Sequence, residues 1–120
     1  MDWPGRIETA PEVDIETRRA DDAPAHRTTI WVVVDDGDVY VRSWRGTAGR
    51  WHRELTANPS AVLHVEGEAI LVRAAAASDP DSVARASAGY RRKYGDSSYV
   101  GSMLSDEIVG TTVRLEPQQR

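Results

Sequence analysis

The fold of this chain is decided by residues 28–44, which read TTIWVVVDDGDVYVRSW. Residues 28–35 are apolar on both parities, so they predict a strand that is covered on both of its faces. Asp35-Asp36-Gly37-Asp38 is typical of a turn, and residues 39–44 are expected to run back as the second arm of a hairpin. A strand without a polar face favours a closed or half-closed barrel over an open sheet.

The segments on either side of this hairpin predict further strands and two main helices. The expected elements are an edge strand over 12–18, a short helix over 50–57 ended by Asn58-Pro59, a second hairpin from 60–65 and 69–75, a helix from Asp79-Pro80 to Gly95, a further helical turn or two within 97–106, a last strand over 111–116 and a tail over 117–120. This order predicts one α+β domain over residues 1–120, a mainly antiparallel β-barrel of about six strands with two or three helices.

Composition limits the function. Fourteen of the fifteen basic residues are arginine, Lys93 is the only lysine, and the net charge of -4 disfavours nucleic acid and anionic membranes as partners. Codon bias and a local basic site are both consistent with such an arginine excess, and composition does not separate them. The absence of cysteine excludes disulfides and thiolate metal sites. Residues 30–34 are too short an apolar run to cross a membrane, and no signal peptide is recognisable, so we expect a soluble cytoplasmic protein.

Residues 42–51, RSWRGTAGRW, hold the densest chemical information. Three arginines, two glycines, two hydroxyls and two tryptophans lie between the end of a strand and the start of a helix. A helix N-terminus offers unpaired N–H groups, glycine lets a ligand approach the main chain, and arginine binds phosphate oxygens in a bidentate way. The alternative is an ordinary loop with solvated arginines and core tryptophans. The spacing matches neither a Walker A loop nor a dinucleotide fingerprint.

A resemblance adds to this pattern. The hairpin of residues 28–43, the Gly49-Arg50-Trp51 turn, the helix end Leu55-Thr56-Ala57-Asn58-Pro59 and the strand 62–65 resemble the FMN-binding split-barrel superfamily. That group includes pyridoxamine-phosphate oxidase and the deazaflavin-dependent nitroreductases. The chain is also similar to a small bacterial split-barrel family of unknown function. The resemblance covers residues 12–77 and implies a split β-barrel.

The resemblance also implies a cofactor, FMN or deazaflavin, and a site for it. Its phosphate would lie against Arg42, Ser43, Arg45 and the main chain of residues 46–49, and Thr29 and Trp31 would approach the ring. The implied cofactor residues are Thr29, Trp31, Arg42, Ser43, Trp44, Arg45, Gly46, Gly49, Arg50 and Trp51. The cofactor would transfer hydride, so no catalytic triad is expected. The nitroreductases usually carry Lys or His-Pro where this chain has Ala48-Gly49-Arg50, which leaves haem or no cofactor open.

Four more residues are candidates for a substrate pocket. His64 and Arg73 share strand parity with residues that can face a pocket, while Tyr90 and Tyr94 can present hydroxyls at its mouth; each also has a packing role as its alternative. The hydroxyl of Tyr99 could line the same mouth. His26, His52 and His64 fall in a loop, a helix and a strand without ligand spacing, so no metal site is predicted.

Three classes of function remain open at this point. The resemblance implies a flavin- or deazaflavin-dependent oxidoreductase that acts on a small organic substrate. It also suggests a homodimer, because many split-barrel flavoproteins place the cofactor between two subunits. The second class is a small-ligand-binding protein or a cofactor-independent enzyme that reuses the pocket. The third is a structural subunit whose hairpin faces form a dimer surface.

Overall fold

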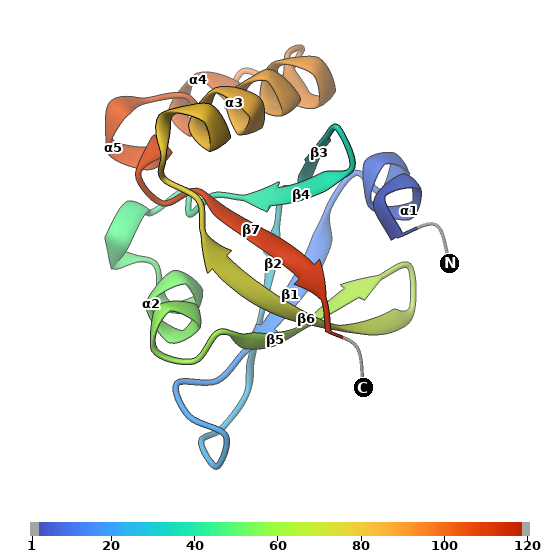
Figure 1. The fold of residues 1–120 in the computed structure, drawn as a ribbon, viewed down its shortest axis with the longest axis vertical. Coiled ribbons are helices and arrows are strands. Elements are labelled where there is room, and N and C mark those ends of the chain that lie inside the picture. Colours follow the sequence, from blue (N-terminus) through green and yellow to red (C-terminus); the bar gives the residue numbers. More distant parts are fainter. Residues whose placement is uncertain (1–2, 119–120) are drawn as a thin grey trace.

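The computed structural model describes residues 3–118, and its centre is a curled antiparallel sheet (Figure 1). The elements in chain order are α1 (Trp3–Thr9), β1 (Val13–Thr17), β2 (His26–Ile30), β3 (Val33–Asp35), β4 (Asp38–Val41), the 3-10 turn η1 (Gly46–Ala48), α2 (Arg50–Ala57), β5 (Ser60–Val65), β6 (Glu68–Ala76), α3 (Pro80–Tyr94), α4 (Val100–Met103), α5 (Asp106–Val109) and β7 (Val113–Pro117). The strand order is β2-β1-β5-β6-β7-β4-β3. This half-barrel confirms the predicted α+β split barrel.

Both predicted hairpins form around two-residue turns. In the β3–β4 hairpin, Asp35 pairs with Asp38, and Asp36 and Gly37 both have positive φ, 49° and 82°. The β5–β6 hairpin repeats this geometry, with φ of 49° at Glu66 and 86° at Gly67. Two successive left-handed residues give the turn whose twist matches that of the flanking strands, which is why a glycine stands second in each.

The strand predicted over residues 28–35 is interrupted. Residues 26–30 pair with β1 at one edge of the sheet, whereas residues 33–35 pair with β4 at the other edge. Trp31 and Val32 lie between these two pairings and belong to neither strand. The apolar run therefore reflects a crossing from one sheet edge to the other, and periodicity alone does not reveal such a break.

The main core fills the concave side of the sheet. Its fully buried side chains come from six strands or their ends, and include Ile15, Val32, Val39, Val41, Leu63, Val65, Val72 and Leu115. Two helices close it: α1 contributes Trp3 and Ile7, and α2 contributes Trp51 and Leu55. In each helix the pair lies four residues apart, so one face is apolar. Helix α2 is therefore anchored by a core tryptophan next to its exposed N-terminus.

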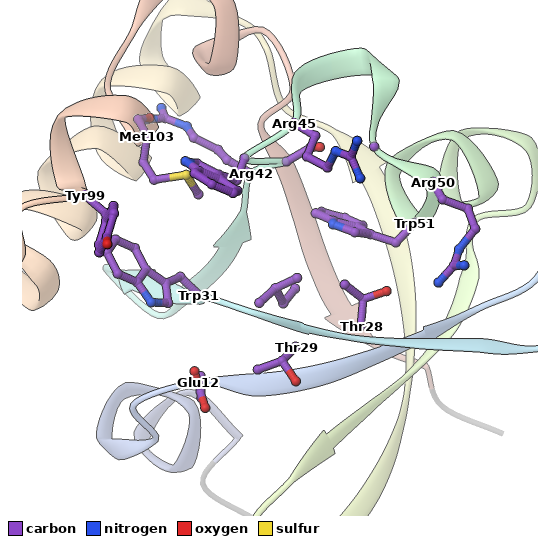
Figure 2. A pocket seen from close by; sticks show the side chains of 14 residues that line it. Glu12, Thr28, Thr29, Trp31, Arg42, Arg45, Arg50, Trp51, Tyr99 and Met103 are labelled. Atoms are coloured by element: carbon purple, nitrogen blue, oxygen red, sulfur yellow. The ribbon is translucent and has the colours of Figure 1, made fainter.

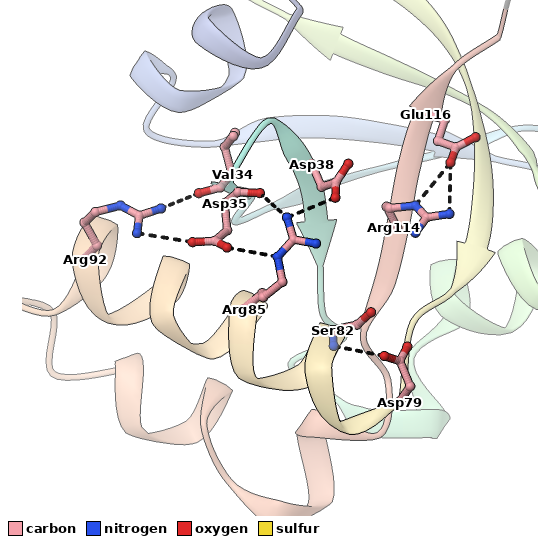
Figure 3. Close-up of polar contacts among 9 residues, drawn as sticks. All are labelled: Val34, Asp35, Asp38, Asp79, Ser82, Arg85, Arg92, Arg114 and Glu116. Atoms are coloured by element: carbon pink, nitrogen blue, oxygen red, sulfur yellow. Dashed lines mark hydrogen bonds and ion pairs between the residues drawn. The ribbon is translucent and has the colours of Figure 1, made fainter.

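Helix α3 covers the outer face of β3 and β4. Asp79 accepts a hydrogen bond from the Ser82 N–H at 3.1 Å and Pro80 occupies the first turn, which confirms the predicted helix start (Figure 3). Helix α3 and strand β3 approach closely at Gly89, where an added Cβ would lie 3.0 Å from the Val33 side chain. A second core lies between them, made of Val33, Tyr40, Ala77, Ala86, Tyr90, Met103 and Ile108.

Several elements differ from the predictions. Seven strands and five α-helices are described, against about six strands and two or three helices predicted. Helix α1 was not predicted because Pro4 and Gly5 interrupt its sequence, although Trp3 and Ile7 share a face. Pro117 ends β7 instead of starting a tail, and the rest of the predicted tail lies partly outside the described residues.

Candidate functional site

A pocket of about 600 Å³ opens between β2, the end of β4, the loop into α2 and the segment before α4. Its lining residues are Glu12, Thr28, Thr29, Ile30, Trp31, Arg42, Ser43, Trp44, Arg45, Gly49, Arg50, Trp51, Tyr99 and Met103. Nine of the ten residues predicted to bind a cofactor are in this set, and Gly46 is the exception. Figure 2 shows Arg45 and Arg50 on one side of the pocket and Trp31 and Tyr99 on the other.

The loop after β4 and the first residue of α2 each present an unbonded guanidinium group. Arg45 and Arg50 are exposed, and neither makes a side-chain hydrogen bond or ion pair with any residue in the part of the chain described. Gly49 is the N-cap of α2, and no side chain caps the helix. Its first turn therefore offers N–H groups and partial positive charge beside two cations. This arrangement is suited to an anion.

Ser43 adds a polar atom without a partner. The residue is 1% exposed and lines the pocket, and its Oγ has no hydrogen-bond partner among residues 3–118. Buried hydroxyls are nearly always hydrogen-bonded, so an orphan of this kind requires an explanation such as a ligand. Gly49 lies over it, and a Cβ there would come within 2.4 Å of the Ser43 Oγ. Glycine at this position therefore keeps the hydroxyl and the helix N-terminus close together.

Arg42 lies at the pocket wall in a different state. Its guanidinium is buried and donates to Thr112 Oγ1 (2.8 Å), the Met103 carbonyl (2.9 Å), the Val83 carbonyl (2.9 Å) and Ser87 Oγ (2.9 Å). It also lies 5.3 Å from the centre of the Tyr90 ring. Burial lowers the pKa of Arg42 below its usual value. These bonds join the end of β4 to the helices behind the pocket. We therefore do not assign Arg42 to the phosphate.

The lining of the pocket is also rich in aromatic side chains. Trp51 is a core residue with an edge at the pocket, whereas Trp44 and Tyr99 are 62% and 65% exposed. The Trp31 indole is stacked on Tyr94, with ring centroids 4.0 Å apart and an interplanar angle of 1°. Exposed large aromatic side chains beside a concave surface are typical of sites for flat ligands. Tyr99 was expected at the mouth of a substrate pocket, whereas Glu12 and Met103 were not predicted as site residues.

The four residues predicted for a substrate pocket do not form one site. His64 lines a separate polar cavity of about 410 Å³ and lies 3.0 Å from Glu16 Oε1. Arg73 is exposed on β6 and lines neither cavity. Tyr90 is fully buried, which raises its pKa, and Tyr94 lies behind Trp31, where burial raises its pKa to about 12. Parity and helical spacing placed each residue on a face without showing which faces meet.

The described residues contain neither a cluster of metal ligands nor a membrane-spanning helix. Residues 3–118 contain no group of three or more histidine or carboxylate side chains that could hold a metal ion. Among the helices described, none has the length and apolar content required to cross a membrane.

Comparisons with solved structures identify the fold. The heme-storage protein HutZ from Vibrio cholerae matches with a TM-score of 0.73 and 14% identity over 99% of this chain and 89% of its own. A putative pyridoxamine 5'-phosphate oxidase from Listeria innocua matches with a TM-score of 0.65 and 13% identity over 96% and 90%. A NimC/NimA family protein from Clostridium acetobutylicum matches with a TM-score of 0.62 and 13% identity over 97% and 79%.

The sequence comparison identifies the family. A search of curated proteins finds no match. A family model described as "Uncharacterized protein conserved in bacteria (DUF2255)" matches residues 5–115, nearly the whole chain. Together with the structural matches, this confirms the resemblance to split-barrel proteins and to a bacterial family of unknown function. The chain belongs to the DUF2255 family of bacterial proteins.

Proposed function

We propose that the chain binds a phosphate-bearing flavin or deazaflavin in the larger pocket and is an oxidoreductase that acts on a small organic substrate. The observation that carries this proposal is the orphan Ser43 hydroxyl beside the uncapped N-terminus of α2, with the unbonded Arg45 and Arg50 next to it. Backbone N–H groups, a hydroxyl and two guanidiniums are the donors that a phosphate dianion requires.

The other wall of the pocket fits the ring of such a cofactor. Trp31, Trp44 and Tyr99 offer aromatic surface, and a volume near 600 Å³ lies in the range of pockets for small cofactors. Thr29 Oγ1 already donates to Asp14 Oδ1 at 2.6 Å, so toward the pocket it can act only as an acceptor. A hydrogen-bond donor on the edge of the ring would therefore find a partner at Thr29.

In this proposal the residues of the chain bind the cofactor and orient its ring. Arg45, Arg50, Ser43 and the first turn of α2 hold the phosphate, while the aromatic wall excludes water from one side of the ring. A bound flavin or deazaflavin would supply the hydride chemistry.

A haem is the alternative ligand that a structural match brings forward, because HutZ is described as a heme-storage protein. None of the three histidines lines the larger pocket, whereas two unbonded arginines do. These residues favour a phosphate-bearing ligand over an iron porphyrin held by histidine. A pocket that serves a non-redox small ligand remains the second candidate function.

A second copy of the chain is the partner that we propose for the pocket rim. Trp44 and Tyr99 are two of the three most exposed large apolar side chains described, and a protein surface of this kind is typically covered by a partner. One structural match, at a TM-score of 0.55, is described as a domain-swapped dimer. Sedimentation at two protein concentrations should show a dimer that dissociates in a Trp44→Ser, Tyr99→Ser variant; a wild-type monomer at both concentrations contradicts the proposal.

The cofactor proposal is tested by titrating purified protein with FMN, with a deazaflavin and with hemin, followed by the visible spectrum. We expect saturable binding of FMN or deazaflavin at one molecule per chain. The loaded, reduced protein should then transfer electrons to small nitro or quinone acceptors faster than the free reduced cofactor. Saturable binding without faster transfer would favour the non-redox function, and binding of hemin alone would contradict the flavin proposal.

A further inference from the structure

Tyr94 lies directly behind the aromatic wall of the pocket. Its ring is parallel to the Trp31 indole, at 4.0 Å between centroids and 1° between planes. Trp31 lines the pocket and Tyr94 does not. One face of the indole is therefore occupied from the protein side, and the rest of the side chain is left to meet a ligand.

Tyr94 also forms hydrogen bonds with main-chain groups that have no partner strand. Val32 lies between β2 and β3, where the main chain has no partner strand. The Tyr94 hydroxyl accepts the Val32 N–H at 3.3 Å and lies 2.8 Å from the Pro11 carbonyl, to which it donates. The neighbouring Lys93 donates through Nζ to the Val32 carbonyl at 2.7 Å and to the Ile7 carbonyl at 3.1 Å. Both backbone groups of Val32 are thus satisfied by the last turn of α3.

These contacts fix the residue that follows Trp31 as well as the ring of Trp31 itself. A tryptophan outside a β-ladder has a peptide that is free to rotate unless side chains hold it. Here one tyrosine supplies both restraints, a stacked ring and a hydrogen bond. The position of the indole in the pocket therefore depends on a residue that the ligand does not reach.

We propose that Tyr94 is a positioning residue: by holding Trp31 it sets the affinity of the pocket for the ring part of a flat ligand. The inference rests on the proposed function, because it assigns the ring to the Trp31 wall. It separates ring recognition, which depends on α3, from phosphate recognition, which depends on the loop before α2.

The test compares FMN with riboflavin, which has the same ring and no phosphate, in three variants. Tyr94→Leu should weaken binding of both ligands by the same factor, about 3- to 10-fold, since an aromatic stack contributes roughly that much. Tyr94→Phe keeps the stacked ring and loses the hydroxyl's bonds to the Val32 N–H and the Pro11 carbonyl, so its loss of affinity should be smaller than that of Tyr94→Leu. Arg92→Ala is the matched control: it removes a bond from α3 to the Val34 carbonyl without touching Trp31.

A second readout needs no ligand. The indole N–H resonance of Trp31, assigned through Trp31→Phe, should shift in Tyr94→Leu, because the ring current of the stacked tyrosine is lost, and remain near its wild-type position in Tyr94→Phe and Arg92→Ala. An unshifted resonance in Tyr94→Leu would overturn the inference even if that variant is less stable.

The outcomes separate the two proposals. Wild-type protein that binds neither FMN nor riboflavin contradicts the proposed function. Wild-type protein that binds them, with Tyr94→Leu binding both as tightly, contradicts the role of Tyr94 alone. A loss in Arg92→Ala equal to that in Tyr94→Leu also overturns the role, because it would show a general loosening of α3.

Discussion

Arg42 and Arg45 are three residues apart in the sequence, yet their guanidinium groups have opposite surroundings. Arg42 is buried and donates to four oxygens of the protein, whereas Arg45 is exposed at a pocket and bonds to no described residue. Arg85 resembles Arg42: it bonds to the Asp35 carboxylate and carbonyl and to Asp38 (Figure 3). Arg50 resembles Arg45. One group of arginines joins elements of the fold, and the other is available to a ligand.

The difference shows which arginines a ligand can use. A guanidinium has five N–H donors, and Arg42 has most of them committed to the interior, so it is not free to follow an anion. Arg45 and Arg50 have no such commitments, and an ordered anion would satisfy them at little cost in desolvation. The following predictions test this division.

The largest effect is expected for Arg42→Ala. The substitution leaves buried carbonyl and hydroxyl oxygens without donors and removes the link from β4 to the helices that cover it, so the free energy of unfolding should fall by about 3 kcal/mol or more. Chemical denaturation measures this fall. Arg45→Ala is the matched control and should change the free energy of unfolding by less than about 0.5 kcal/mol, as usual for a surface site. Equal losses in the two variants would contradict the division.

Gly49→Ala should have an intermediate effect. The new methyl group would meet the Ser43 Oγ at 2.4 Å, so the free energy of unfolding should fall by about 1–3 kcal/mol, the usual cost of overpacking. The φ of Gly49 is -64°, which alanine adopts readily, so the cost is steric. Adding Ser43→Ala removes the atom in conflict and should restore most of the loss. If the losses of Gly49→Ala and Ser43→Ala simply add in a double-mutant cycle, residue 49 does not pack against the Ser43 hydroxyl.

The smallest effect is a pH dependence at Lys93, a cation bonded to interior carbonyls like Arg42. Burial lowers the pKa of Lys93 from 10.5 to about 8 in the folded protein. Between pH 8 and 10.5 the unfolded chain binds more protons at this position, so the contribution of Lys93 to stability rises with pH across that window. The difference in unfolding free energy between wild type and Lys93→Met should therefore grow in favour of wild type from pH 7.5 to 9.5, by about 1–2 kcal/mol. A constant difference would show that Lys93 titrates normally.

Local patterns predicted much of the fold. Asp36-Gly37 and Glu66-Gly67 mark two-residue turns with positive φ, and Asp79-Pro80 starts α3, because these features depend on neighbouring residues only. The break at Trp31-Val32 was missed because it depends on which strands lie at the two sheet edges. Periodicity reports that a segment is buried and carries no information about its partner.

The candidate site was predicted only in part, because local patterns identify residues that are neighbours in the sequence and not those that meet through the fold. The loop from Arg42 to Trp51 is contiguous, so its residues were found together, and most of them line one pocket. Glu12 and Met103 reach that pocket from distant parts of the chain, and no local pattern in the sequence marks them as site residues. Arg42 could not be told apart from Arg45, since its partners Val83, Met103 and Thr112 are more than forty positions away.

The central claim is that Arg45 and Arg50 bind the phosphate of a flat cofactor while Arg42 is committed to the interior behind the pocket. The measurement that tests it most directly is the ratio of the riboflavin and FMN dissociation constants in wild type and in an Arg45→Ala, Arg50→Ala double variant. If the two cations hold the phosphate, FMN should bind about 30- to 1000-fold more tightly than riboflavin in wild type, equivalent to about 2–4 kcal/mol, and the ratio should fall by about tenfold or more in the double variant, where only Ser43 and the first turn of α2 remain. A ratio that is equally large in both proteins would contradict the claim.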